Sequence, residues 1–132
     1  MNRREASPAI DIFWSYTRAF QAFDAKAVAT FFHEPSMLVT PRGVLALPNT
    51  WAVEQAYAEI MDQLRGGPYA STEFSSARER VLSDELVELS GNGTWVDRDG
   101  RRYMPFGFTY TLRQTKLGYR IVVALVHAPG TT

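Results

Sequence analysis

The hydrophobic pattern of this chain changes its period once, at about residue 69. Before that point apolar residues recur every three or four positions, which is the repeat of an amphipathic helix. Beyond it they alternate with small or polar residues, which is the repeat of a half-buried strand. The pattern therefore predicts helices with one or two short strands first, and a four-stranded antiparallel meander afterwards. Segregated helices and strands are typical of the α+β class.

Two helices are predicted at the start of the chain. Ser7 is followed by a proline, which pairs a capping oxygen with a residue suited to the first helical position, so we expect a helix from there to about residue 22. Asp24 can cap a second helix that carries Phe31 and Phe32 on its inner side. We expect Pro35 to end that helix, because the residue before a proline is disfavoured in helical geometry.

A third helix is predicted after two short apolar stretches. Met37–Thr40 indicates a short strand that ends at a Pro-Arg-Gly turn. Val44–Leu47 then forms either a second short strand or a lip over the core. Asn49 or Thr50 can then cap a helix with a clear apolar stripe. The sequence Gly66-Gly67-Pro68 is expected to end it.

The second half of the chain predicts four strands, at about residues 71–82, 85–96, 104–112 and 119–128. Gly91-Asn92-Gly93 lies in the middle of the second of these strands and indicates a bulge or a sharp bend. Asp99-Gly100 is a strong two-residue hairpin signal between the second and third. The last strand is apolar on both faces, so we expect it to be central in the sheet.

Composition excludes several classes of protein. The 132 residues suit one domain, over residues 1–132, and 14 basic residues balance 14 acidic ones. Zero net charge argues against a nucleic-acid partner, and the lack of cysteine excludes disulfides and thiolate metal sites. The basic stretch Met1–Glu5 is not followed by the apolar core of a signal peptide, and no apolar run is long enough to span a membrane. A cytoplasmic protein without membrane contact is expected.

Several local stretches resemble the nuclear transport factor 2-like superfamily, which includes SnoaL-like polyketide cyclases, ketosteroid isomerases and scytalone dehydratase. The resemblance runs from about Ser7 to His127 and rests on element order and on these stretches: Ala19–Val28 with Phe31-Phe32, Met37–Pro41, Gly93–Trp95 and Tyr119–Val122. It implies three N-terminal helices packed in a strongly curved, mainly antiparallel sheet, a cone with an apolar pocket. It also implies a homodimer packed through the sheet. A two-layer sandwich without a cavity is the alternative.

The active-site pattern of the steroid isomerases is only partly present. Tyr16 on the first helix matches their tyrosine, but the stretch Met37–Thr40 has no carboxylate where they carry a base. If the protein is an enzyme, His127 on the last strand is the candidate acid or base. Tyr57 or Tyr110 would then stabilise an enolate-like oxygen. The alternative for His127 is a strand-end histidine bonded to backbone or water.

Aromatic residues are the most informative group. Some are expected to line a pocket for a flat apolar ligand, with adaptable methionines in its wall, although all of them could simply fill the core. The candidate ligand-binding residues are Trp14, Tyr16, Phe20, Met37, Met61, Trp95, Phe106 and Phe108. Spacing indicates no metal site, and no cofactor is expected.

Two functions therefore stay open. One is a homodimeric protein that binds a small, largely apolar molecule and uses proton transfer for an isomerisation, dehydration or ring closure. The other is a non-catalytic module that binds a ligand or dimerises.

Overall fold

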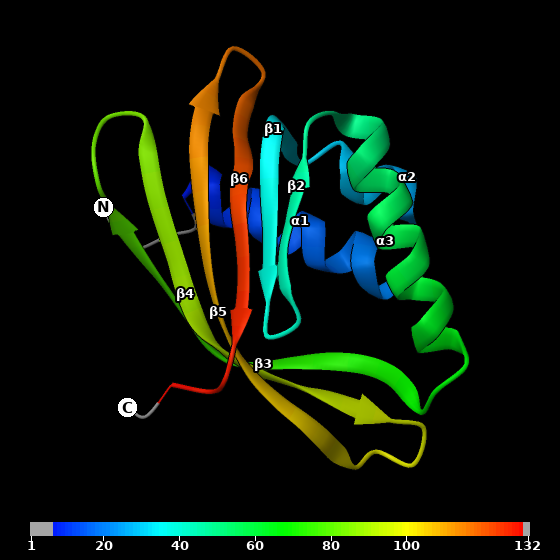
Figure 1. The fold of residues 1–132 in the computed structure, drawn as a ribbon. Helices are drawn as coiled ribbons and strands as arrows, with labels where there is room; N and C mark the ends of the chain where they lie inside the picture. The colour runs from blue at the N-terminus through cyan, green and yellow to red at the C-terminus, as the bar shows by residue number, and fades with distance from the viewer. Residues whose placement is uncertain (1–6, 131–132) are drawn as a thin grey trace.

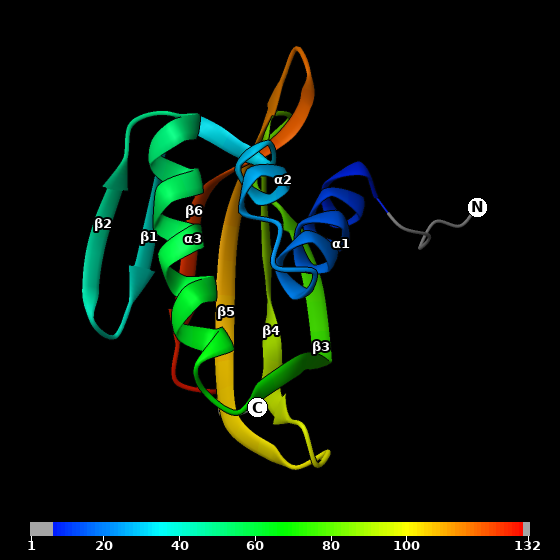
Figure 2. The ribbon, with the colours of Figure 1, turned by 90° about the vertical axis from the view of Figure 1, so that its right-hand side faces the viewer.

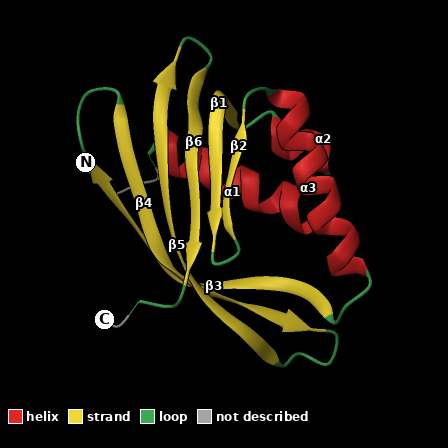
Figure 3. Ribbon diagram, in the orientation of Figure 1, coloured by secondary structure: helices red, strands yellow, loops and turns green. Residues whose placement is uncertain are grey.

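Residues 7–130 form a six-stranded sheet with three helices on one of its faces (Figures 1 and 3). The computed structural model describes residues 7–130, so the stretch Met1–Glu5 lies outside the described residues. The strand order is β2-β1-β6-β5-β4-β3, and only β1 and β6 pair in parallel. The predicted α+β class and mainly antiparallel curved sheet are confirmed.

The helices begin at the predicted caps. Their bounds are α1 Pro8–Gln21, α2 Ala25–Ala29 and α3 Thr50–Arg65. The side chains of Ser7, Asp24 and Asn49 each accept a hydrogen bond from a backbone N–H in the first turn of the helix that follows. Within residues 7–130, no helix combines the length and the apolar character needed to cross a membrane.

The strands include the predicted meander and two earlier strands. Their bounds are β1 Phe32–Thr40, β2 Gly43–Leu47, β3 Tyr69–Val81, β4 Leu86–Asp97, β5 Arg102–Thr115 and β6 Gly118–His127. As expected, β6 is central, between β1 and β5. Because β1 and β2 extend the meander, the sheet is wide enough to curve around the helices.

The predicted end of α2 is wrong. The helix stops at Ala29, and Phe32 already belongs to β1, where it pairs with Ile121. The backbone of Phe31 also joins the sheet, because its carbonyl accepts from Ile121 N at 2.8 Å. Pro35 lies inside β1, where the register with β6 shifts and the missing N–H breaks no regular ladder.

His33, which precedes the expected helix end at Pro35, is therefore a strand residue. Its Nδ1 donates to the carbonyl of Pro35 at 2.9 Å. It bears no relation to the end of α2, because the chain has already turned into the sheet.

The sheet bends sharply across β3, β4 and β5. Figure 1 shows the lower parts of these strands turning beneath α3, and Figure 2 shows the same curl from the side. Gly91 and Gly93 lie at the bend, and a Cβ on either would meet backbone and a phenylalanine ring. Across from them, the extra residue Ser75 makes a bulge in β3. The bend predicted from Gly91-Asn92-Gly93 is confirmed, with the bulge on the neighbouring strand.

The core lies between the concave face of the sheet and the helices. Its largest fully buried side chains come from α1, α3, β2, β4, β5 and β6, and include Phe13, Leu47, Tyr57, Met61, Leu89, Phe108, Leu112 and Ile121. Burying each such side chain contributes about 1.5–3 kcal/mol. Phe13, Tyr57 and Phe108 of this core also border a cavity between the sheet and the helices.

Candidate functional site

A cavity of about 1000 Å³ opens between the bent sheet and the helices α1 and α3. Buried residues form its depth, and these are Phe13, Tyr16, Thr17, Leu38, Tyr57, Leu64, Phe108 and Tyr110. Exposed residues form its mouth, and these include Pro41, Arg42, Val44, Leu45, Glu59, Gln63 and Met104. Its size suits a drug-sized organic molecule, and its walls are largely apolar.

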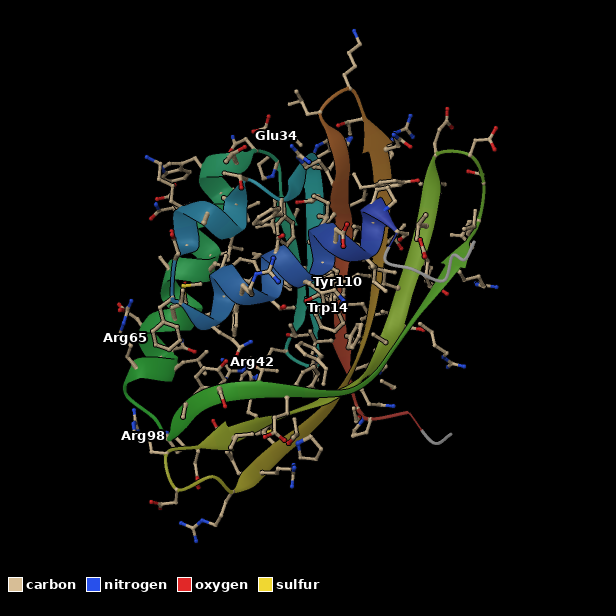
Figure 4. All side chains as sticks on the ribbon, turned by 180° about the vertical axis from the view of Figure 1, so that it is seen from behind. Trp14, Glu34, Arg42, Arg65, Arg98 and Tyr110 are labelled. Carbon is tan, nitrogen blue, oxygen red and sulfur yellow. The ribbon has the colours of Figure 1, made fainter. Side chains whose placement is uncertain are left out.

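Three tyrosine hydroxyls meet in the depth of this cavity. Tyr16 comes from α1, Tyr57 from α3 and Tyr110 from β5, where it lies beneath α1 (Figure 4). The Tyr16 hydroxyl is 2.9 Å from that of Tyr57 and 2.8 Å from that of Tyr110. We call these residues the tyrosine triad. Each is at most 5% exposed, so the hydroxyls form a small polar group in apolar surroundings.

Local patterns place each member of the triad. On α1, Phe13 and Tyr16 lie three residues apart and share the buried face of the helix. On α3, Tyr57 lies four residues after the buried Val53 and four before the buried Met61. Tyr110 alternates with outward-facing residues of β5, so it points toward the helices.

The triad has one hydrogen-bond donor more than it uses. Three hydroxyls carry three protons, and the two oxygen–oxygen contacts use one proton each. No other described residue is hydrogen-bonded to these three hydroxyls. One O–H therefore remains to donate, and a buried donor without an acceptor is unfavourable by about 1–3 kcal/mol.

Burial keeps the triad protonated. Desolvation raises the pKa of Tyr110 to about 12 and raises the pKa values of Tyr16 and Tyr57 well above the ordinary value. For Tyr16 the neighbouring tyrosines raise the pKa further. All three hydroxyls are hence neutral at physiological pH. The triad can therefore donate a hydrogen bond to a ligand oxygen that has a lone pair.

Alkaline unfolding should report these pKa values. Tyrosines of the unfolded chain ionise near pH 10, whereas Tyr110 in the folded protein ionises near 12 and the other two triad members also ionise above their ordinary value. Between these values the unfolded state holds fewer protons, so stability is full below about pH 10 and falls above it by about 1.4 kcal/mol per pH unit for each tyrosine. Urea unfolding at pH 8, 10 and 11 measures this fall. The prediction is contradicted if the free energy of unfolding falls with pH no more than it does in a variant with phenylalanine at all three positions.

His127 is not brought to the triad. Val122 is an extra residue in β6, because Thr111 pairs with Val123 while Leu112 pairs with Ile121. This bulge reverses the alternation, so His127 does not share the inward face of Ile121. A regular alternation from Ile121 would place His127 on the inward face, and the bulge at Val122 is the reason that it does not lie there.

The ring of His127 lies on the outer side of the sheet, at the edge of the cavity. It occupies the space next to Gly107, whose neighbour Phe108 points inward. Its Nδ1 donates to the carbonyl of Ala128, and its Nε2 accepts from Thr109 Oγ1 at 3.1 Å. Both ring nitrogens are thus engaged, as in the strand-end interpretation, and its acid–base role stays a prediction.

The predicted ligand-binding residues divide into two groups. Tyr16, Phe20, Trp95, Phe106 and Phe108 line the cavity.

Trp14, Met37 and Met61 do not line it. Trp14 packs its ring against Phe13 and Phe74, and Met61 is buried in the core beneath α3. Met37 pairs with the outward-facing Val123 and lies on the opposite face of the sheet. The expectation that the two methionines form the wall is therefore corrected.

Two parts of the lining were not predicted as site residues. Thr40, Arg42 and Leu45 belong to the hairpin formed by β1 and β2, which approaches the cavity only because the sheet curves. Glu59 and Gln63 lie on the face of α3 beside its apolar stripe. Their spacing of four residues next to that stripe is the one sequence signal that could have indicated them.

Charged residues are sparse in this lining. Arg42 is the basic and Glu59 the acidic side chain of this lining, and both are exposed at the mouth. Within residues 7–130, no group of three or more His, Asp or Glu side chains is placed to hold a metal ion. The chemistry that the depth of the cavity offers is hydrogen-bond donation by the triad.

Comparison with known families places the fold. The family described as NTF2-like protein (DUF6841) matches residues 4–129, which is nearly the whole chain. The chain belongs to this NTF2-like family. No curated protein sequence matches the chain.

Solved structures share the NTF2-like fold at low sequence identity. An NTF2-like protein with a cystatin-like fold from Novosphingobium aromaticivorans has a TM-score of 0.74 and 13% identity, over 92% of this chain and 80% of that one. A proposed dehydratase of the NTF2-like family from Streptomyces avermitilis has a TM-score of 0.69 and 14% identity, over 92% of each chain. A proposed aromatic ring hydroxylase from N. aromaticivorans has a TM-score of 0.72 and 15% identity, over 97% and 92%. At these identities the likeness concerns the fold.

Proposed function

We propose that this protein binds a small, largely apolar molecule through an oxygen atom that accepts a hydrogen bond from the tyrosine triad. The unused O–H donor of the triad carries the proposal, because it lies in a cavity whose other deep residues are mainly apolar. A ketone, phenol or enol oxygen has the lone pair that this donor needs.

The walls of the cavity favour a flat molecule. Phe13 and Phe108 stack with ring centroids 4.9 Å apart, and both rings border the cavity near Tyr110. Phe106 and Trp95 line the bent part of the sheet. Aromatic walls of this kind bury a planar ring system over a large area.

Binding is favoured over acid–base catalysis by the placement of charges. The carboxylate in the lining, Glu59, is exposed at the mouth, and both nitrogens of His127 are engaged. Among the described residues, none that borders the triad is a ready proton acceptor.

Proton-transfer chemistry is the second candidate. The triad could stabilise an enolate-like oxygen during an isomerisation, dehydration or ring closure, and a structural neighbour is named as a proposed dehydratase. In that case His127 must release its bonds to Thr109 and Ala128 before it can act as acid or base.

The predicted homodimer and cytoplasmic location remain part of this proposal. Met37, Val123 and Leu125 lie on the outward face of β1 and β6, and each is partly exposed. A second copy of the chain packed on this face would cover them.

A variant that fills the cavity tests the proposal. Ala56 on α3 lines the cavity, whereas Ala58 on the same helix is exposed and does not. We expect Ala56→Phe to weaken binding of 9-fluorenone by at least about tenfold because its ring occupies the ligand's space. Isothermal titration calorimetry measures the affinity, and a thermal melt confirms that the variant is folded.

Ala58→Phe is the matched control and should bind like the wild type. If Ala56→Phe binds the ketone as tightly as the control does, the ligand lies elsewhere. If the wild type binds no planar ketone up to its solubility limit, the proposed function is wrong.

A further inference from the structure

An arginine stands at the mouth of the cavity, opposite the apolar depth. Arg42 occupies the turn between β1 and β2, where Thr40 Oγ1 accepts a hydrogen bond from its backbone N–H at 3.2 Å. The residues on both sides of it, Pro41 and Gly43, also line the cavity, so the whole turn forms one lip of the mouth. Figure 4 shows Arg42 in the region between the ribbons of α1 and β3, from which other lining residues come.

The guanidinium of Arg42 differs from those of the arginines on the nearby β4–β5 hairpin. Arg98 donates to the carbonyl of Gly67, and Arg101 pairs with Asp97 and Asp99. Within residues 7–130, no carboxylate oxygen lies within 4 Å of the guanidinium of Arg42. Among the described residues none accepts a hydrogen bond from this guanidinium either, so its five N–H donors remain for a ligand.

Both polar ends of the cavity thus offer donors. The triad supplies one O–H in the depth, and Arg42 supplies a planar fork of N–H groups at the mouth. The acidic residue at the mouth is Glu59 on α3, which would repel an anion and attract an amine. An arginine fork gains most from a carboxylate, which can accept two parallel hydrogen bonds.

We infer that the ligand is an apolar oxo acid: its oxygen binds the tyrosine triad and a carboxylate at its other end binds Arg42. This inference rests on the proposed function and adds the anionic class of the ligand.

Three probes with the same ring and arm separate the possibilities. Each carries a four-carbon arm on 9-fluorenone, ending in a carboxylate, a primary amide or an amine. We expect the wild type to bind the carboxylate at least about tenfold more tightly than the amide, because the ionic hydrogen bonds to Arg42 form only with the acid. The amine should bind no better than the amide.

Variants assign the preference to Arg42. Arg42→Gln should abolish the preference, so that the acid binds no better than the amide, because Glu59 still repels the carboxylate. Arg42→Lys should keep part of the preference because it keeps the positive charge. Arg113 is exposed on β5 outside the cavity lining, so Arg113→Gln should keep the full preference. Glu59→Gln should tighten binding of the acid, since it removes the repulsion.

The outcomes distinguish this inference from the function on which it rests. The binding function stands if the amide binds and Ala56→Phe abolishes that binding. The anionic class of the ligand is wrong if the wild type does not prefer the acid, or if Arg42→Gln still prefers it. A preference for the amine would mean that Glu59, and not Arg42, binds the end group of the ligand, and would also overturn the inference. If none of the three probes binds, both proposals are wrong.

Discussion

Gly91→Ala is expected to lower the free energy of unfolding by about 3 kcal/mol or more, the upper end of the cost of overpacking. A Cβ at this position would overlap the carbonyl oxygen of Ser76 and approach Phe108 Cζ to 2.9 Å. The oxygen belongs to the backbone of a neighbouring strand, so it cannot turn away as a flexible side chain would. The bend in β4 must open to make room, and the cavity is built on that bend. Urea unfolding followed by tryptophan fluorescence measures the loss.

Gly66→Ala is the matched control for this substitution. Gly66 follows α3 with ordinary helical angles, and the nearest atom to an added Cβ is 3.7 Å away. It should change stability by no more than about 0.5 kcal/mol. If the Gly91 and Gly66 variants are equally stable, the close approach of β3 and β4 does not hold the bend.

Replacing the whole triad by phenylalanine should abolish the preference for an oxygen-bearing ligand. We expect the wild type to bind 9-fluorenone at least about tenfold more tightly than fluorene, which has the same rings without the oxygen, because only the ketone satisfies the unused donor. The variant Tyr16→Phe/Tyr57→Phe/Tyr110→Phe should bind the two compounds alike. Calorimetric titration of both compounds into both proteins gives the comparison.

The triple variant is a cleaner test than any single substitution. Tyr16→Phe alone leaves Tyr57 and Tyr110 without their shared partner, at a cost of about 1–3 kcal/mol, and still presents donors to the cavity. Removing all three hydroxyls together leaves an apolar site of nearly the same shape, which is close to neutral for stability. A triple variant that still prefers fluorenone would show that another group holds the oxygen.

The helices and the antiparallel meander were predictable because their signals are local. A capping side chain such as Ser7 or Asn49 and a repeat of apolar residues determine a helix within a few turns. The end of α2 was not predictable in this way. Phe31 and Phe32 suit a helix by spacing, but their backbone pairs with Ile121, almost ninety positions along the chain.

The candidate site was predictable where a regular repeat holds, as it does for Tyr16 and Tyr57 on the helices and for part of the sheet. Tyr110 and Phe108 point inward because β5 alternates regularly there. His127 does not, because a single bulge at Val122 exchanges the two faces of β6, and nothing in the run of apolar residues marks it. Arg42 could not be found at all, since its place at the mouth depends on how far the sheet curls.

The infrared carbonyl stretch of bound 9-fluorenone tests the central claim most directly, because it reports hydrogen bonding to the ketone oxygen itself. In the wild-type protein we predict a band at lower wavenumber than that of the ketone in an alkane solvent, since the triad donates its unused proton to that oxygen. In the triple phenylalanine variant the band should return to the alkane position. A wild-type complex with its band at the alkane position would contradict the account, because the ketone would be bound without the tyrosines.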